Sequence, residues 1–382
     1  MGQESIIHWL THAGPYFPQG ATWEHARNIL QTYFRNITSL SAISSFVSSS
    51  LKDPSQLITL YKETDPLESS LYFSSALTIV HYIMSEITKN YSQVDKAWSI
   101  LPGLYAWHYT IHDYLLNGSF RPRLLVGAIL ISIWGARLTY NFARKGGYYF
   151  NGQDYRYPYL RERLGPVGMA LLNLVFIAPF QNLLLLYIVT PLYITHSLFS
   201  NASVRTTAGL STLDWITVIL HLGLLFIEVV ADEQQYVFQT EKYALLSHLN
   251  KDQLKGDYKL GFLWHSGLFQ YSRHPNFFAE QSMWWVIYLF SVAAVQEASG
   301  MSDLSTYLNW TIAAPIVLTA LFQGSTALTE VSYSSRLSYH ANAERIPLHL
   351  VENLQREVSC LRRVLQICQQ ILALDFQKCP NS

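Results

Sequence analysis

Several polar side chains fall in the segment 272–280, SRHPNFFAE, immediately before a long apolar stretch. Pro275 favours the first position of a helix, where its missing N–H costs nothing. Asn276 and Glu280 are four residues apart and therefore share one face of that helix. Because helix N-termini attract anions and arginine binds phosphate through a bidentate fork, Arg273, Asn276 and Glu280 predict a site for a phosphate-bearing ligand. The alternative is a basic loop that touches lipid headgroups, with the two helical side chains capping the backbone.

A second group of polar residues lies in two other apolar segments. Trp134, Arg137 and Asn141 follow the spacing i, i+3, i+7 and share a helix face. An arginine within an apolar helix is costly unless it is paired or solvated, so Arg137 is a candidate functional residue, with snorkelling to headgroups as the alternative. Asp232 follows the apolar run 222–230 and is a third candidate. Asp95 precedes another apolar stretch, where it serves either as a helix cap or in chemistry.

The composition indicates a membrane protein. Of 382 residues, 50% are hydrophobic and 14% charged, whereas soluble domains carry about 25% charged residues. The formal net charge of zero gives no reason to expect a nucleic-acid partner. The three cysteines form no CxxC pair, and His108 and His112 lack an acidic partner of the HExxH type, so no metal site is predicted.

Apolar segments of spanning length predict an all-α, polytopic bundle of about seven transmembrane helices. These segments are 69–88, 97–116, 122–143, 166–197, 212–235, 276–298 and 309–332. Pro179 and Pro191 could divide the fourth segment into two parts. Basic residues concentrate after the third and fifth segments and in the C-terminal tail. The positive-inside rule then predicts a lumenal N-terminus and a cytosolic C-terminus.

The same pattern divides the chain into three regions. Residues 1–67 form an N-terminal extension, residues 68–340 a seven-helix membrane domain, and residues 341–382 a cytosolic tail. Apolar residues at helical spacing between 349 and 374 predict an amphipathic helix in that tail.

Four motifs carry a family resemblance. They read YSQVDKAWSILP (91–102), WGARLTYNFARKGGYYF (134–150), ADEQQYVF (231–238) and LFQYSRHPNFFAE (268–280). They resemble the DUF1295 branch of the steroid 5-alpha-reductase-like membrane proteins over residues 90–340. The RHP-plus-glutamate pattern is also similar to isoprenylcysteine carboxyl methyltransferases and phospholipid methyltransferases, in which it helps to bind S-adenosylmethionine.

The reductase resemblance implies a seven-helix bundle that holds NADPH from the cytosolic side. Asn276 and Glu280 would then meet the nicotinamide end. The remaining residues that the resemblance assigns to the cofactor are Arg137, Asp232, Tyr258, Lys259 and Arg273.

The chain departs from the reductase pattern at two catalytic positions. Trp134 stands where steroid reductases have a catalytic tyrosine, and Ile100 ahead of Pro102 stands near their catalytic glutamate. Asp95 and Tyr140 are therefore the predicted proton donors.

These observations together predict an NADPH-dependent oxidoreductase of the endoplasmic reticulum membrane. It would reduce a carbon–carbon double bond in a lipophilic, sterol- or acyl-like substrate, with membrane lipid around it. One alternative is an S-adenosylmethionine-dependent methyltransferase acting on a lipid or prenyl-cysteine. The other is a non-catalytic membrane scaffold or lipid-binding protein.

Overall fold

The computed structural model describes residues 17–38, 55–154, 156–199, 209–302 and 304–326. Within these ranges the secondary structure is entirely helical. The chain divides into two compact units, residues 1–316 and 317–382, and the features below all lie in the first. The amphipathic helix predicted for 349–374 lies outside the described residues.

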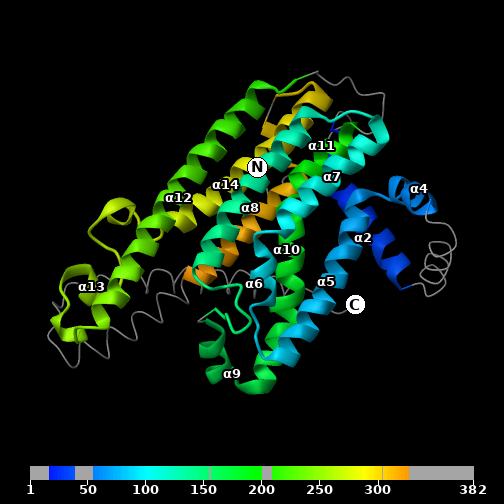
Figure 1. Cartoon of the computed structure of the whole chain (residues 1–382). Coiled ribbons are helices and arrows are strands. Elements are labelled where there is room, and N and C mark those ends of the chain that lie inside the picture. Colours follow the sequence, from blue (N-terminus) through cyan, green and yellow to red (C-terminus); the bar gives the residue numbers. More distant parts are fainter. Residues whose placement is uncertain (1–16, 39–54, 155, 200–208, 303, 327–382) are drawn as a thin grey trace, which may run out of the picture. The chain divides into compact units, whose positions relative to one another are not determined.

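Figure 1 shows the helices of the first unit. In chain order they are α2 (Trp23–Ile37), α4 (Ser55–Glu63), α5 (Pro66–Thr88), α6 (Gln93–Trp98), α7 (Leu101–Asn117), α8 (Pro122–Arg144), α9 (Arg156–Leu172), the π-helix η2 (Asn173–Phe180), α10 (Gln181–Tyr187), α11 (Thr190–Phe199), α12 (Thr212–Leu246), α13 (Gly256–Leu260) and α14 (Pro275–Ser299). Short 3-10 turns occur at Gln19–Ala21, Lys251–Gln253, Gly267–Gln270, Leu304–Leu308 and Trp310–Ile312. Residues 313–326 are also helical.

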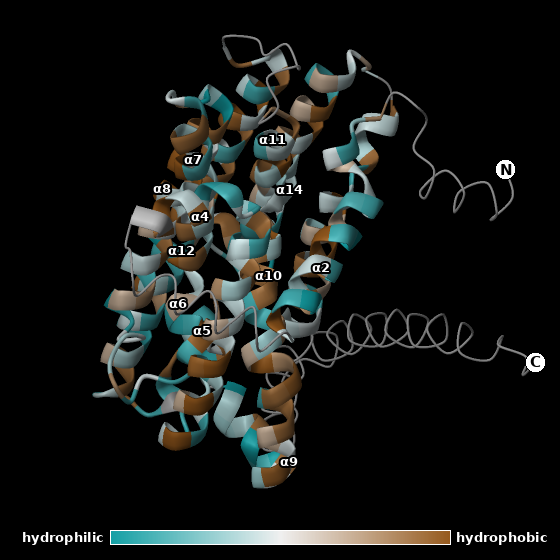
Figure 2. Ribbon diagram, turned by 90° about the vertical axis from the view of Figure 1, so that its right-hand side faces the viewer, coloured by the Kyte–Doolittle hydropathy of each residue, from teal (hydrophilic) through white to brown (hydrophobic). Residues whose placement is uncertain are grey.

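Four stretches of the described chain are long and apolar enough to cross a membrane: Pro122–Arg144, Arg156–Tyr187, Thr212–Leu246 and Pro275–Ser299. Figure 2 shows apolar residues recurring along the helices of the bundle. The chain is therefore a helical membrane protein with several apolar helices. Of the seven expected segments, 69–88 and 97–116 correspond to α5 and α7, which carry more polar residues.

The predicted segment 166–197 is not one straight helix. Just before it, Gly165 adopts a positive φ of 67°, which marks a kink within α9. Pro179 lies inside the π-helical turn η2, where it cannot supply an N–H to a regular α-helical ladder. The chain then continues through α10 and α11. The expectation of a two-part crossing thus agrees with the observed breaks.

The N-terminal region packs against the bundle through α2 and α4. The Asn36 amide of α2 donates to Glu68 of α5 at 2.8 Å. The Tyr61 hydroxyl of α4 lies 2.8 Å from Nδ1 of His108 on α7. Residues 17–38 and 55–63 therefore form part of the helical body.

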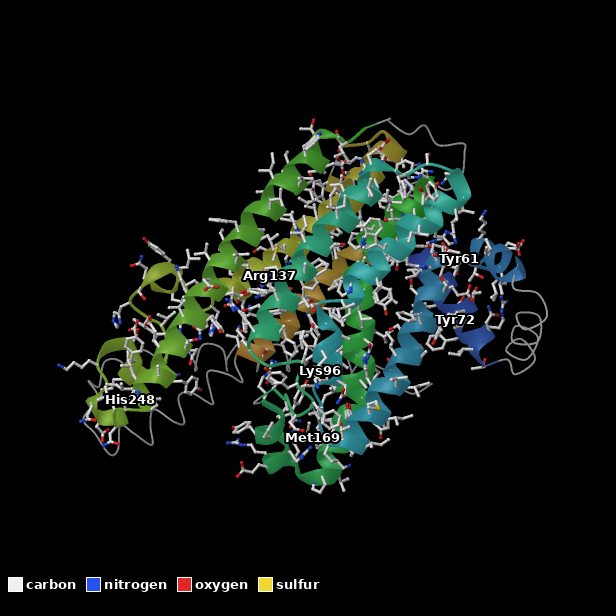
Figure 3. The ribbon with its side chains drawn as sticks, in the orientation of Figure 1. Tyr61, Tyr72, Lys96, Arg137, Met169 and His248 are labelled. Atoms are coloured by element: carbon white, nitrogen blue, oxygen red, sulfur yellow. The ribbon has the colours of Figure 1, made fainter. Side chains whose placement is uncertain are left out.

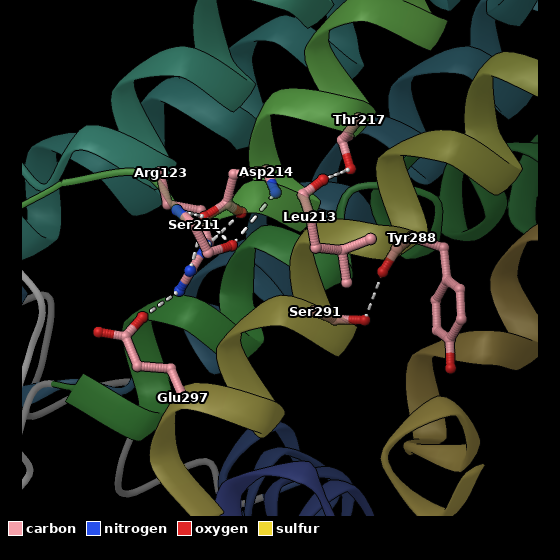
Figure 4. Close-up of polar contacts among 8 residues, drawn as sticks. All are labelled: Arg123, Ser211, Leu213, Asp214, Thr217, Tyr288, Ser291 and Glu297. Atoms are coloured by element: carbon pink, nitrogen blue, oxygen red, sulfur yellow. Dashed lines mark hydrogen bonds and ion pairs between the residues drawn. The ribbon is translucent and has the colours of Figure 1, made fainter. Parts of the chain in front are cut away.

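Helices α8, α12 and α14 form a group of neighbours, and a buried ion cluster joins them at one end (Figure 4). Arg123 of α8 donates to both carboxylate oxygens of Asp214 at 2.7 Å. Its third nitrogen donates to Glu297 of α14 at 3.0 Å. Asp214 also closes the capping box of α12 with Ser211. One buried guanidinium thus joins the ends of three helices. Because each of its three nitrogens donates to a carboxylate, it sets the relative positions of α8, α12 and α14.

We expect Arg123→Met to destabilise the protein strongly, because Asp214 would become a buried carboxylate without its cation. Breaking a buried ion pair from one side costs about 3–5 kcal/mol. The thermal midpoint of unfolding in detergent measures this loss. The matched control is Arg163→Met, because Arg163 is exposed and its guanidinium lies over the ring of Tyr159. Equal midpoints for the two variants would contradict a structural role of the Arg123 ion cluster.

Candidate functional site

A second buried ion cluster lies further along the same three helices, around Arg137 of α8 (Figure 3). Its Nη1 lies 2.6 Å from Oδ2 of Asp232 and 2.8 Å from Oε1 of Glu228, both on α12. Its Nη2 lies 3.3 Å from Oε2 of Glu280 on α14. Arg137 therefore contacts three carboxylates, the most distant of which, Glu280, is 143 positions away in the sequence.

Two tryptophans orient Glu280 within this cluster. The indole N–H of Trp134 donates to Oε2 at 2.8 Å, and that of Trp284 donates to Oε1 at 3.0 Å. The two rings pack edge to face with centroids 4.9 Å apart. Because indole is only a donor, these contacts suit a carboxylate acceptor and hold its plane in place. Trp134 thus positions an acidic group.

Glu228 belongs to the cluster, although the sequence analysis did not single it out. It lies within the apolar run 222–230, one turn before Asp232, and this i, i+4 pairing is the signal that could have revealed it. Among the described residues, its Oε2 and the Nε of Arg137 have no hydrogen-bond partner. Three carboxylates around one guanidinium leave an excess of acceptors. The cluster therefore suits a ligand group that donates hydrogen bonds or carries positive charge.

The cofactor residues predicted from the third and sixth apolar segments differ in their surroundings. Arg137 has both terminal nitrogens engaged by carboxylates, so it organises the acidic groups. Asn276 is half-buried in the first turn of α14, one turn before Glu280. Asn276 is thus one helical turn from Glu280, which belongs to the cluster.

The predicted residues Tyr258, Lys259 and Arg273 lie on the segment 247–274, which connects α12 to α14. Figure 1 shows this segment alongside the C-terminal part of α12. Tyr258 of α13 stacks on Phe238 with centroids 5.2 Å apart, and its hydroxyl donates to Glu241. The guanidinium of Arg273 lies 5.5 Å from the centre of the Trp264 ring.

One backbone contact ties this connection to α12 near the ion cluster. The N–H of Leu268 donates to the Gln234 side chain at 2.9 Å. Gly267 has a φ of 61°, and a Cβ there would lie only 2.3 Å from that side-chain oxygen. A glycine is thus required where the connection passes over α12.

Comparisons with known proteins match most of the chain, including this cluster. A family model described as a protein of unknown function, DUF1295, matches residues 81–346. The chain belongs to the DUF1295 family. An uncharacterized protein of Schizosaccharomyces pombe is 36% identical over 277 residues, which cover 71% of this chain and 75% of the yeast protein. No solved structure matches the chain. All four charged residues of the Arg137 cluster fall inside the DUF1295 match.

The two predicted proton donors of this DUF1295 protein lie elsewhere. Tyr140 is 66% exposed, and the guanidinium of Arg144 lies 5.4 Å from its ring centre. Asp95 lies on α6, where its Oδ1 accepts a hydrogen bond from the Tyr157 hydroxyl at 3.3 Å. Its Oδ2 is buried, with no partner in the described part of the chain. No recorded contact joins either residue to Arg137.

Burial raises the pKa of Asp95 from 3.8 to about 6, with a further contribution from Asp154 and opposition from Arg156. A carboxyl group with such a pKa remains partly protonated near neutral pH, as a general acid requires. Because the folded pKa is above the unfolded one, Asp95 supports folding below about pH 4 and loses that contribution as the pH rises through about 6.

We therefore expect Asp95→Asn to raise the free energy of unfolding at pH 7.5 and to leave it nearly unchanged at pH 4. The difference between 3.8 and about 6 corresponds to at most roughly 3 kcal/mol. Thermal unfolding in detergent across this pH range measures the effect. Asp252→Asn, in the exposed turn Lys251–Gln253, is the control and should show no such dependence. A pH-independent difference between Asp95→Asn and the natural protein would argue against a buried, titrating carboxyl group.

Proposed function

We propose that this protein is a membrane-embedded, NADPH-dependent reductase of a carbon–carbon double bond in a lipophilic substrate. The observation that carries the proposal is the cluster in which Arg137, Asp232 and Glu280 meet inside the bundle. These residues come from three of the motifs that resemble the steroid reductases. Buried ionisable residues in a membrane bundle are costly, and function is the usual reason for keeping them.

The residues present suit the nicotinamide end of NADPH. A carboxamide donates through its NH₂ group and accepts through its oxygen. The unpaired Oε2 of Glu228 provides an acceptor for that NH₂ group. Asn276, one turn before Glu280, provides both a donor and an acceptor. The amide and carboxylates thus complement a planar carboxamide.

Cations for the phosphates come from the connection between α12 and α14. Lys255, Lys259 and Arg273 lie within nineteen positions of one another in this connection, and Arg273 lies two residues before the start of α14. Arginine binds phosphate through its fork, and the N-terminus of α14 adds a favourable dipole. When bound, NADPH supplies a hydride to the β-carbon of an activated double bond. The matching proton comes from an acid of the chain, for which Asp95 and Tyr140 are our proposed donors.

A lipophilic substrate is consistent with the outer surface of α12. Ile219 and Phe226 are 67% and 69% exposed, whereas the opposite face of the helix is buried. An apolar exposed face on a spanning helix is suited to contact lipid. The substrate would enter sideways from the bilayer, and the cofactor would approach from the connection between α12 and α14.

The excess of carboxylates also favours a second candidate, an S-adenosylmethionine-dependent methyltransferase of a lipid or prenyl-cysteine. The sulfonium and ammonium groups of that cofactor are cations, which the acidic cluster would attract. NADPH remains our choice because its phosphates also use the basic residues of the connection. A non-catalytic lipid-binding scaffold would need neither the acidic cluster nor the basic residues of the connection.

The deciding experiment is thermal stabilisation of the purified chain in detergent by NADPH, NADH and S-adenosylmethionine. We expect NADPH to raise the unfolding midpoint most, because a ligand that binds only the folded state stabilises it. Asn276→Ala should weaken NADPH binding several-fold, since a lost hydrogen bond costs on the order of 1 kcal/mol. Gln270→Ala, at an exposed position just before α14, should bind like the natural protein.

Stabilisation by S-adenosylmethionine alone would replace the reductase with the methyltransferase. Stabilisation by none of the three compounds would favour the scaffold. Equal NADPH binding by Asn276→Ala and Gln270→Ala would remove α14 from the cofactor site.

We further propose that the protein resides in the endoplasmic reticulum membrane with seven spans, a lumenal N-terminus and a cytosolic C-terminus. The basic residues after α8 and α12 support this orientation. A reporter fused to the C-terminus should be cytosolic, and one inserted within 199–211 should be lumenal. Protease protection of intact microsomes measures both positions. Two reporters on the same side would contradict the topology.

A further inference from the structure

The Arg137 cluster contains more acidic than basic groups. Three carboxyl groups contact its guanidinium, and they belong to Glu228, Asp232 and Glu280. The exposed Lys145 directly follows α8 and adds a second positive charge near Glu228 and Asp232. All three carboxyl side chains are more than nine-tenths buried. Because burying an ionised carboxylate is costly unless cations and hydrogen-bond donors replace the lost water, three carboxylates here would exceed the charge that two cations can balance.

Glu280 has the surroundings of an ionised carboxylate. Its Oε1 accepts a hydrogen bond from the indole of Trp284, and its Oε2 accepts from the indole of Trp134 and from Nη2 of Arg137. Asp232 likewise accepts from Nη1 of Arg137 at 2.6 Å. Indole and guanidinium groups only donate. Glu280 and Asp232 are therefore the two anions of the cluster.

Glu228 is surrounded differently. Its Oε1 lies 2.8 Å from Nη1 of Arg137, the same nitrogen that donates to Asp232. No group of the described residues donates a hydrogen bond to its Oε2. The Glu228 side chain lies instead at hydrogen-bonding distance from that of Glu280. Since ionised carboxylates only accept, a hydrogen bond between these two groups requires a proton on one of them.

Electrostatics place this proton on Glu228. Two carboxyl groups that share a buried site cannot both ionise without strong repulsion, so such a pair retains one proton. Ionised Glu280 keeps its three donors, whereas ionised Glu228 would keep an oxygen without any. With one proton on Glu228, the anions Asp232 and Glu280 are matched in number by the cations Arg137 and Lys145.

We propose that Glu228 and Glu280 share one proton, held by Glu228, and that Glu228 is a proton donor of this site. The shared proton depends only on the contacts of the cluster, whereas the donor role rests on the proposed function. It adds to Asp95 and Tyr140 a third donor, which contacts Arg137. A protonated carboxyl group keeps acceptor capacity, so the assignment is compatible with the carboxamide contact proposed above.

The proton step can be written for the proposed reduction, which adds a hydride to one carbon of a double bond and a proton to the other. The O–H bond of Glu228 breaks, and a C–H bond forms at the second carbon. The electron pair of the broken π bond enters that C–H bond, and the pair of the O–H bond stays on Glu228. The resulting carboxylate regains a proton from water, which its repulsion from Glu280 favours.

Infrared spectroscopy of the full-length purified chain in detergent, near neutral pH, tests the shared proton. The C=O stretch of a protonated carboxyl group is separate from carboxylate and amide bands, and it shifts in D₂O. Glu228→Gln should lose one such band relative to the natural protein. Glu280→Gln should lose the same band, because Glu228 then faces no second carboxylate and ionises beside Arg137. Any band from Asp95 is common to these proteins and cancels in difference spectra.

Glu233→Gln is the matched control. Glu233 is an exposed glutamate on the same helix, and its carboxylate pairs with Arg144. This variant should keep the acid band. Persistence of the band in Glu228→Gln would overturn the shared proton. Persistence in Glu280→Gln would show that Glu228 holds a proton without its neighbour and would overturn the sharing.

Thermal unfolding across pH gives a second measurement. Near neutral pH the unfolded chain has released the glutamate proton that the folded pair retains, so folding takes up a proton and rising pH opposes it. From about pH 5 to about pH 8 the natural protein should therefore lose stability relative to Glu228→Gln. Glu233→Gln should follow the natural protein. A difference between Glu228→Gln and the natural protein that does not change with pH would contradict a retained proton.

NADPH separates the donor role from the shared proton. A donor must still hold its proton when the reduced cofactor is bound, so the acid band should persist at saturating NADPH. Loss of the band on NADPH binding would overturn the donor role and leave the shared proton of the free protein. Absence of any stabilisation by NADPH would remove the reductase and the donor role together. The band of the free chain would then still decide whether Glu228 and Glu280 share a proton.

Discussion

Burying an arginine inside an apolar helix bundle is the constraint on which the central part of this structure depends. A guanidinium cannot release its proton in a protein, so it must be surrounded by acceptors or reach water. Arg137 meets this requirement with carboxylates from two other helices, and Arg123 does so at the far end of the same group. Each arginine therefore dictates where α12 and α14 lie relative to α8. The helices cannot slide along one another without breaking these contacts.

The two clusters use this constraint differently. Around Arg123, every terminal nitrogen has a well-aligned partner, and Asp214 also caps its own helix. Because all three nitrogens of Arg123 have hydrogen-bond partners, that arrangement suits a structural role. Around Arg137, three carboxylates face one guanidinium, and both Oε2 of Glu228 and Nε of Arg137 lack a hydrogen-bond partner among the described residues. A buried cluster with unpaired hydrogen-bonding atoms lowers stability. The Arg137 cluster is therefore more informative about ligand binding than the Arg123 cluster.

Trp134 illustrates how the chemistry of one side chain sets its role in the Arg137 cluster. A tyrosine could donate a proton to a substrate, but an indole N–H keeps its proton and serves to position an acceptor. Here it holds Glu280 together with Trp284. The DUF1295 chain thereby holds three carboxylates around Arg137 in a fixed geometry. Asp95, whose burial raises its pKa to about 6, lies on the separate helix α6.

The sequence by itself determined the class of fold and the approximate ends of α8 and α14, because hydropathy and helical spacing are local properties. It also placed Arg137, Asp232 and Glu280 in apolar segments, where charged side chains are conspicuous. It also carried the motifs of the DUF1295 family. Tertiary structure alone decided that these three residues share one cluster, that Glu228 joins it, and that Asp95 and Tyr140 do not contact it. The difference has a physical reason: helix formation follows from neighbouring residues, whereas the pairing of a buried polar atom depends on which side chains distant parts of the chain bring within about 3 Å.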